Sequence, residues 1–216
     1  MKHMKYLIGI ILFGSLWGFS ESIIGPFFSD YGLPSGLIMT GFFALTLMVL
    51  SRRLYPIYGM QAGMGLVAGS LRMFNPLGGC HLCSALAIVA EGLLFELLWY
   101  STTKYDFRKL NSITQKISLG IVTGYGVYVG GYIITQILTP LSFGQFYLNN
   151  LLSMVPQYLA RGLPAALIGG FMIPVILVSL QHAPLRQHLN NTWYYPTSIG
   201  VSVLCWIIVL GNFFFI

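Results

Sequence analysis

Long apolar segments with few charged residues between them run through the whole chain. Only 7% of the 216 residues are charged, whereas 56% are hydrophobic. Soluble domains carry about 25% charged residues, so this sequence cannot cover a surface that faces water. Transmembrane β-barrels alternate polar and apolar residues in segments of about ten residues, whereas the apolar segments here are continuous and long. We therefore predict an all-α, polytopic helical bundle forming one integral-membrane domain, 1–216.

A membrane-spanning helix needs about 20 residues, so a chain of this length holds six or seven of them. The predicted spans are 6–25, 35–50, 56–74, 84–100, 117–138, 157–180 and 196–216. The first segment is interpreted as a span and not as a cleavable signal, because no small-residue cleavage site follows its basic start.

The basic residues predict the orientation of the bundle. If the spans alternate in direction, one side carries a set of lysines and arginines and the opposite loops carry none. The set is Lys2, Lys5, Arg52, Arg53, Lys104, Arg108, Lys109, Lys116 and Arg186. By the positive-inside rule, we expect a prokaryotic cytoplasmic membrane with the N-terminus inside and the C-terminus outside. This placement accounts for the net charge of +6 without a nucleic-acid partner.

The segment 151–180 is too long for one upright helix and contains Pro156, Pro164 and Pro174. Proline inside a helix removes a hydrogen bond and kinks or breaks the helix. One interpretation is an interfacial or re-entrant piece at Leu151–Arg161 followed by a span from about Gly162. The other is a single tilted and kinked span.

Ionisable residues inside the spans are candidates for function, because each is costly in hydrocarbon unless it is paired or hydrated. Glu21, Arg72, Glu91 and Arg161 are predicted to line an outward-opening cavity, with Trp17 one turn before Glu21 and Asn75 beyond Arg72. The alternative is structural: Glu21–Arg72 and Glu91–Arg161 would be ion pairs that hold the bundle together. Trp17 could stack on a ligand or could simply pack in the core.

Glu96 is predicted to lie apart from this group. It follows Glu91 by five residues, which is about 140° around a helix, so the two carboxylates do not share a face.

The turn Cys80-His81-Leu82-Cys83 offers three soft ligands in four residues. Thiolates and imidazole suit zinc, copper or nickel, so Cys80, His81 and Cys83 are candidate ligands of a soft transition metal. The same spacing is used for redox chemistry. On an oxidising exterior the two thiols would instead form a disulfide or stay idle. All three readings remain open at this stage.

Motifs of soluble catalysis, such as G-x-S-x-G, a Walker A loop or H-E-x-x-H, are not present in the sequence. We therefore expect no enzyme activity and no catalytic residues.

The layout resembles the substrate-binding S components of energy-coupling factor (ECF) importers over about Tyr6–Leu180. The resemblance lies in the chain length, the stretch GSLWGFSE at 14–21, and the glycine-rich segment that leads through Asn75 and Pro76 to Glu91. It implies a substrate that enters from outside, and a coupling transmembrane subunit with ATPases as partners. The small residues Gly14 and Gly18 would match the patch that docks on that subunit. Two features depart from the family: a seventh helix, and a start of Met-Lys-His where the cobalt and nickel branch begins Met-His.

The leading hypothesis is therefore the substrate-binding subunit of a prokaryotic importer for a small molecule or metal ion. The alternatives are a membrane thiol-redox or metal-binding protein that uses the Cys80–Cys83 turn, and an accessory structural subunit of a larger membrane complex.

Overall fold

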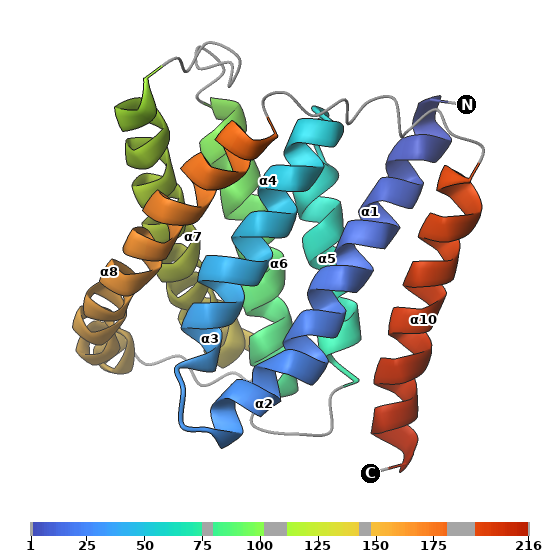
Figure 1. Ribbon diagram of the computed structural model, residues 1–216. Coiled ribbons are helices and arrows are strands. Elements are labelled where there is room, and N and C mark those ends of the chain that lie inside the picture. Colours follow the sequence, from blue (N-terminus) through green and yellow to red (C-terminus); the bar gives the residue numbers. More distant parts are fainter. Residues whose placement is uncertain (1, 75–79, 102–111, 143–147, 181–192, 216) are drawn as a thin grey trace.

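The structure is a computed structural model that describes residues 2–74, 80–101, 112–142, 148–180 and 193–215 (Figure 1). Throughout this described part the regular elements are helices, and six are long and apolar enough to cross a membrane. The prediction of an all-α, multi-pass membrane bundle is confirmed.

Each of the first two spans is a continuous series of three helical pieces. The first consists of α1 (Lys2–Phe19), η1 (Ser20–Ile24) and α2 (Gly25–Asp30), and the second of α3 (Ser35–Ile38), η2 (Met39–Ala44) and α4 (Leu45–Leu54). The other helices are α5 (Met60–Arg72), α6 (His81–Ser101), α7 (Ile113–Ser142), α8 (Leu148–Ser179) and α10 (Tyr194–Phe215).

The segments η1 and η2 are π-helical turns, wider than the α-helix around them. In η1 the N–H of Gly25 donates to the carbonyl of Ser20, five residues earlier. Pro26 follows and has no N–H to donate, so a wide turn at this point lets the helix continue through the proline. The first span therefore reaches Asp30, beyond the predicted end at residue 25.

The third apolar segment is a helix of only 13 residues, α5, inside the predicted span 56–74. At a rise of 1.5 Å per residue it covers about 20 Å. Its contacts with α1 advance in the same direction along both helices, from Ile10 beside Gly63 to Gly18 beside Leu71. The helices α1 and α5 are therefore parallel, as expected for the first and third passes of a chain that reverses at every connection.

Helix α5 lies between α1 and α6, so most of its side chains pack against protein, whereas Leu66 and Ser70 are exposed. Met60, Met64 and Ala68 of α5 belong to the main hydrophobic core, with Trp17 of α1 and Phe95 of α6. On the other side, Gly65 and Gly69 pack directly against the backbone of α6. Small residues thus let three helices approach closely.

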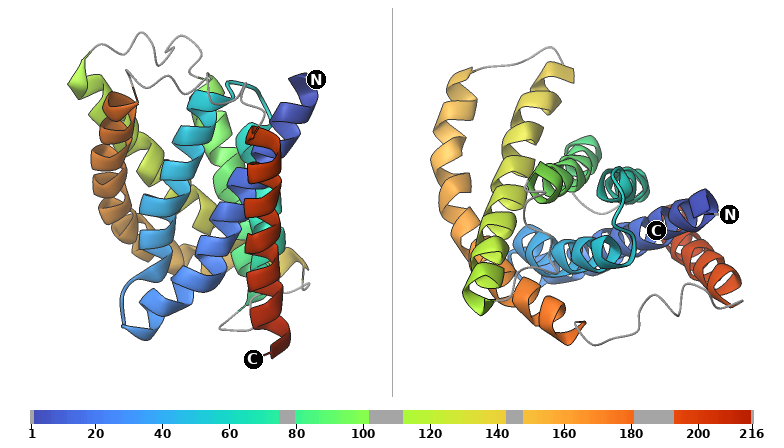
Figure 2. Two further views of the ribbon diagram at one scale, coloured as in Figure 1. Left: turned by 45° about the vertical axis from the view of Figure 1, so that its right-hand side comes forward. Right: turned by 90° about the horizontal axis from the view of Figure 1, so that it is seen from above.

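Helix α8 is one helix of 32 residues that contains all three prolines, so no re-entrant piece forms at Leu151–Arg161. Of the two readings of this segment, the single kinked span is correct. Figure 2 shows α8 curving along α7. The antiparallel contact with α7 holds α8 together: Gly120 faces Gly169, and Gly124 faces Ala165. Each proline removes one backbone hydrogen bond, and this packing keeps the helix intact.

The two termini lie at opposite ends of the bundle (Figure 1). The start of α1, the end of α4 and the start of α7 share one end, so Lys5, Arg52, Arg53 and Lys116 gather there. The helix α10 lies at the edge of the bundle and packs mainly against α1.

Candidate functional site

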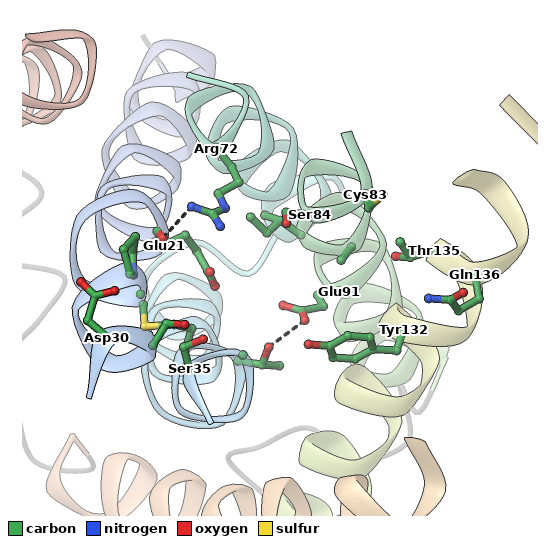
Figure 3. A pocket seen from close by; sticks show the side chains of 18 residues that line it. Glu21, Asp30, Ser35, Arg72, Cys83, Ser84, Glu91, Tyr132, Thr135 and Gln136 are labelled. Carbon is green, nitrogen blue, oxygen red and sulfur yellow. Dashed lines mark hydrogen bonds between the residues drawn. The ribbon is translucent and has the colours of Figure 1, made fainter. Parts of the chain in front are cut away.

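A cavity of about 610 Å³ lies at the end of the bundle opposite these basic residues. Its rim includes Ser29 and Asp30, both exposed, and it extends inward to Glu91, which is halfway along α6. Its lining side chains come from η1 and α2 of the first span, from α3 and η2 of the second, and from α5, α6 and α7, and Figure 3 shows them around one space. The polar and charged residues of the lining are Glu21, Ser29, Asp30, Ser35, Thr40, Arg72, Cys83, Ser84, Glu91, Tyr132, Thr135 and Gln136.

The π-helical turns carry residues of this lining. Glu21 belongs to η1, and Met39 and Thr40 belong to η2. Such turns in α-helices are frequent at functional sites, because the extra residue per turn changes the direction in which side chains point. Here it lets two apolar helices present polar groups to one space.

Glu21 and Arg72 meet at one side of the cavity. Arg72 Nη1 donates to the backbone carbonyl of Glu21 at 3.2 Å, and Trp17 Nε1 faces Glu21 Oε1 at 3.4 Å. These contacts connect the end of α5 to the first span. Trp17 is fully buried and does not line the cavity, so it positions Glu21 and does not stack on a ligand, which corrects its assignment as a binding residue.

Glu91 is the deepest charged group of the lining and is 4% exposed. Thr40 Oγ1 donates to Glu91 Oε1 at 2.7 Å, whereas Glu91 Oε2 is buried without a hydrogen-bond partner among the described residues. A Cβ on Gly131 of α7 would come within 2.9 Å of Glu91 Cγ. The glycine thus leaves room for the side chain of Glu91.

The wall formed by α7 is held in place by α8. Tyr132, which lines the cavity, stacks on Tyr158 with ring centroids 4.9 Å apart, and Gln136 Nε2 donates to Tyr158 Oη at 3.1 Å. The position of this polar wall therefore depends on the packing of two long helices.

Three of the residues predicted from sequence, Glu21, Arg72 and Glu91, come together in the cavity. Arg161 does not join them, because its side chain is on the exposed surface of α8. Among the residues that the structure describes, no ion pair joins Arg161 to Glu91. Asn75 lies outside the described residues.

Cys80 and Cys83 are joined in a disulfide. Their sulfurs are therefore not free thiolates, and the predicted metal site of Cys80, His81 and Cys83 is not formed in this structure. Within the described ranges, no group of three histidine, cysteine, aspartate or glutamate residues is placed to hold a metal ion. Of the three readings of this turn, the structure has the disulfide, with Cys83 beside the cavity.

Gly14 and Gly18, predicted to dock on a partner, face the interior of this chain. A Cβ on Gly14 would lie 2.6 Å from Val67 Cβ, and one on Gly18 would lie 2.9 Å from Ala68 Cα. Because α5 occupies this face of α1, the prediction of an external docking patch there is wrong.

Several lining residues were not expected from the sequence: Asp30, Thr40, Ser84, Tyr132, Thr135 and Gln136. A weak signal was present, since Thr40 and Thr135-Gln136 are polar residues in otherwise apolar spans. Hydroxyl and amide groups are common enough in membrane helices that this signal alone does not locate a site.

The arrangement is able to bind a small molecule. It offers carboxylates, a guanidinium and several hydroxyl groups around a space of the size that small ligands occupy. Comparison of the chain with models of known families, with curated proteins and with solved structures finds no match.

Proposed function

We propose that this protein is the substrate-binding subunit of a membrane importer and that the cavity holds its small-molecule substrate. The observation that supports this proposal is the concentration of rare charged groups in a single cavity at one end. Glu21, Arg72 and Glu91 all contribute to its lining, although charged residues are only 7% of the chain. Charged groups at membrane depth typically mark substrate or ion pathways.

The orientation supports the same proposal. The end of the bundle opposite the cavity carries Lys5, Arg52, Arg53 and Lys116, and the positive-inside rule places such residues in the cytoplasm. The cavity would then open to the outside, which is where an importer collects its substrate.

In this proposal, energy comes from separate proteins, a coupling membrane subunit and ATPases, as in ECF importers. Because Gly14 and Gly18 pack on α5, a coupling subunit would contact another surface. The cytoplasmic part of α1 offers one, where Met4 and Leu7 are exposed.

The test is purification of the tagged protein from its own cells in mild detergent, followed by native mass spectrometry. We expect a complex with a second membrane protein and ATPases, and a bound small molecule that is released on denaturation. A chain that purifies alone and empty, under conditions that preserve a known importer complex, would contradict the proposal.

A second candidate function is thiol-disulfide exchange, favoured by the Cys80–Cys83 disulfide at the edge of the cavity. The spacing C-x-x-C is that of thiol oxidoreductases. A working redox pair should be partly reduced in growing cells, which alkylation of free thiols with a mass-tagged maleimide would detect. A pair that remains fully oxidised under oxidising and reducing growth conditions would instead be structural.

A further inference from the structure

The charges that line the cavity do not balance. Glu21, Asp30 and Glu91 contribute three carboxyl groups, and Arg72 is the only basic residue among the described residues of the lining. Arg72 is also engaged by Glu21, through the hydrogen bond to its carbonyl. The lining around Glu91 therefore holds more carboxyl groups than basic groups.

Glu91 adds an independent observation that points to a ligand. Its side chain is more than nine-tenths buried, yet Oε2 has no hydrogen-bond partner in the described part of the chain, while Thr40 donates to Oε1 at 2.7 Å. A buried carboxylate oxygen without a partner is costly. Figure 3 shows the Glu91 carboxyl group pointing into the cavity, beside Tyr132.

The neighbours of Glu91 suit an organic cation better than a metal ion. Calcium and similar ions take six to eight oxygen ligands, whereas in the described part of the chain no group of three metal-ligating side chains is placed together. Tyr132 brings an aromatic ring to the same part of the lining, and an aromatic face attracts organic cations.

We propose that the ligand of this cavity is a small organic cation, whose positively charged nitrogen lies against Glu91 Oε2 and next to Tyr132. This inference rests on the proposed function, since it names the class of substrate. Thr40 fixes the carboxyl group through Oε1 and leaves Oε2 for the ligand. The polar groups of Ser84, Thr135 and Gln136 bind the rest of the molecule.

The test uses the whole protein in detergent and a small-molecule extract of bacterial cells, divided at neutral pH by a cation-exchange resin. The retained fraction holds the organic cations, and the flow-through holds neutral and anionic compounds. Each fraction is added in a dilution series, and the rise in unfolding temperature is measured for the wild type, for Glu91→Gln and for Glu91→Asp. Binding to the folded state raises that temperature.

We expect the retained fraction to stabilise the wild type, with no effect from the flow-through. Glu91→Gln removes the charge but keeps the shape, so it should need an approximately tenfold or higher concentration for the same effect, as for a lost charge-assisted hydrogen bond. Glu91→Asp retains the charge and should retain most of the response. If Glu91→Gln does not fold, the comparison of the two fractions on the wild type decides the question.

The other outcomes overturn the inference in distinguishable ways. Stabilisation by the flow-through alone would mean a neutral or anionic ligand, with the proposed function intact. Stabilisation that a chelator abolishes would mean a metal ion. An equal response of the wild type and Glu91→Gln to the retained fraction would exclude Glu91 as the recognition group. No response to either fraction would contradict both the inference and the proposed function.

Discussion

At the scale of residues, several buried polar contacts are made between spans that are distant in sequence. The Thr40–Glu91 contact joins the second span to α6, and Arg72 joins the end of α5 to the first span. Glu96 has a structural role instead: it accepts hydrogen bonds from the N–H groups of Gly59 and Ala62 at the start of α5. Carboxylates at this position satisfy free N–H groups and favour the helix dipole. Two glutamates of one helix thus serve different purposes, in accord with their predicted separation around α6.

Thr40→Val is expected to lower the stability of the protein. It removes the donor that engages Glu91 Oε1 and leaves a buried carboxyl group with fewer partners, which costs about 1–3 kcal/mol. The measurement is the unfolding temperature in detergent. Thr46→Val is the matched control, because the buried Thr46 Oγ1 makes no hydrogen bond to any residue that the structure describes. Equal destabilisation by the two changes would refute a role for the Thr40–Glu91 contact.

Loss of the Glu96 cap is expected to weaken the start of α5. Glu96→Gln replaces a charged acceptor with a neutral one at Gly59 and Ala62, and caps of this kind contribute about 1 kcal/mol. The unfolding temperature should fall, while ligand response at the cavity should be unchanged, because Glu96 does not line it. A variant as stable as the wild type would show that the cap contributes nothing measurable.

At the scale of elements, glycine determines which helices touch. Gly59 directly precedes α5 and has a φ of +86°, in the left-handed region that glycine adopts without strain. The glycines of α7 and α8 permit backbone contact: a Cβ on Gly120 would lie 2.3 Å from the carbonyl oxygen of Gly169. Because α7 also carries Tyr132, Thr135 and Gln136, this contact positions one wall of the cavity.

Gly120→Ala is therefore expected to push α8 away from α7. The added methyl group meets backbone that cannot move aside, and overpacking of this kind costs about 1–3 kcal/mol. Both the unfolding temperature and ligand affinity should fall. Gly200→Ala on α10 is the control: no atom lies within 4 Å of its added Cβ, and alanine favours the helix over glycine. If Gly120→Ala were as stable as that control, the close α7–α8 contact would be wrong.

At the scale of the whole molecule, the bundle has two chemically different ends. One carries Lys5, Arg52, Arg53 and Lys116, and the other carries the cavity and the disulfide. By the positive-inside rule this asymmetry predicts the orientation of the protein, because translocation of lysine and arginine is disfavoured. The proposed ligand would then enter from outside.

Labelling with a membrane-impermeant maleimide tests the orientation. In a background that lacks Cys205, a Tyr31→Cys variant should react in intact cells, since Tyr31 is exposed near the cavity end. A Tyr58→Cys variant, exposed at the basic end, should react only after the cells are permeabilised. The reverse pattern would place the cavity in the cytoplasm and would contradict import as proposed.

The amino-acid sequence alone determined that this chain is a helical membrane bundle. The length of each apolar segment and its lack of charged residues can be read from that segment alone. In the bilayer, each such segment must satisfy its own backbone hydrogen bonds, which a helix does. The same local rule indicated that Glu21, Arg72 and Glu91 are unusual, because each is costly in hydrocarbon wherever it lies.

Only the tertiary structure decided which of these residues meet. The sequence does not specify which face of a helix packs on a neighbour. For this reason it did not reveal that Gly14 and Gly18 face α5, or that Arg161 lies on the exposed surface of α8. The spacing of residues along a regular helix also does not show where π-helical turns form. In this structure such turns change the direction in which the side chains of Glu21 and Thr40 point. The continuity of α8 through three prolines likewise follows from its contact with α7. Such outcomes depend on the packing of several helices at once, which no single segment encodes.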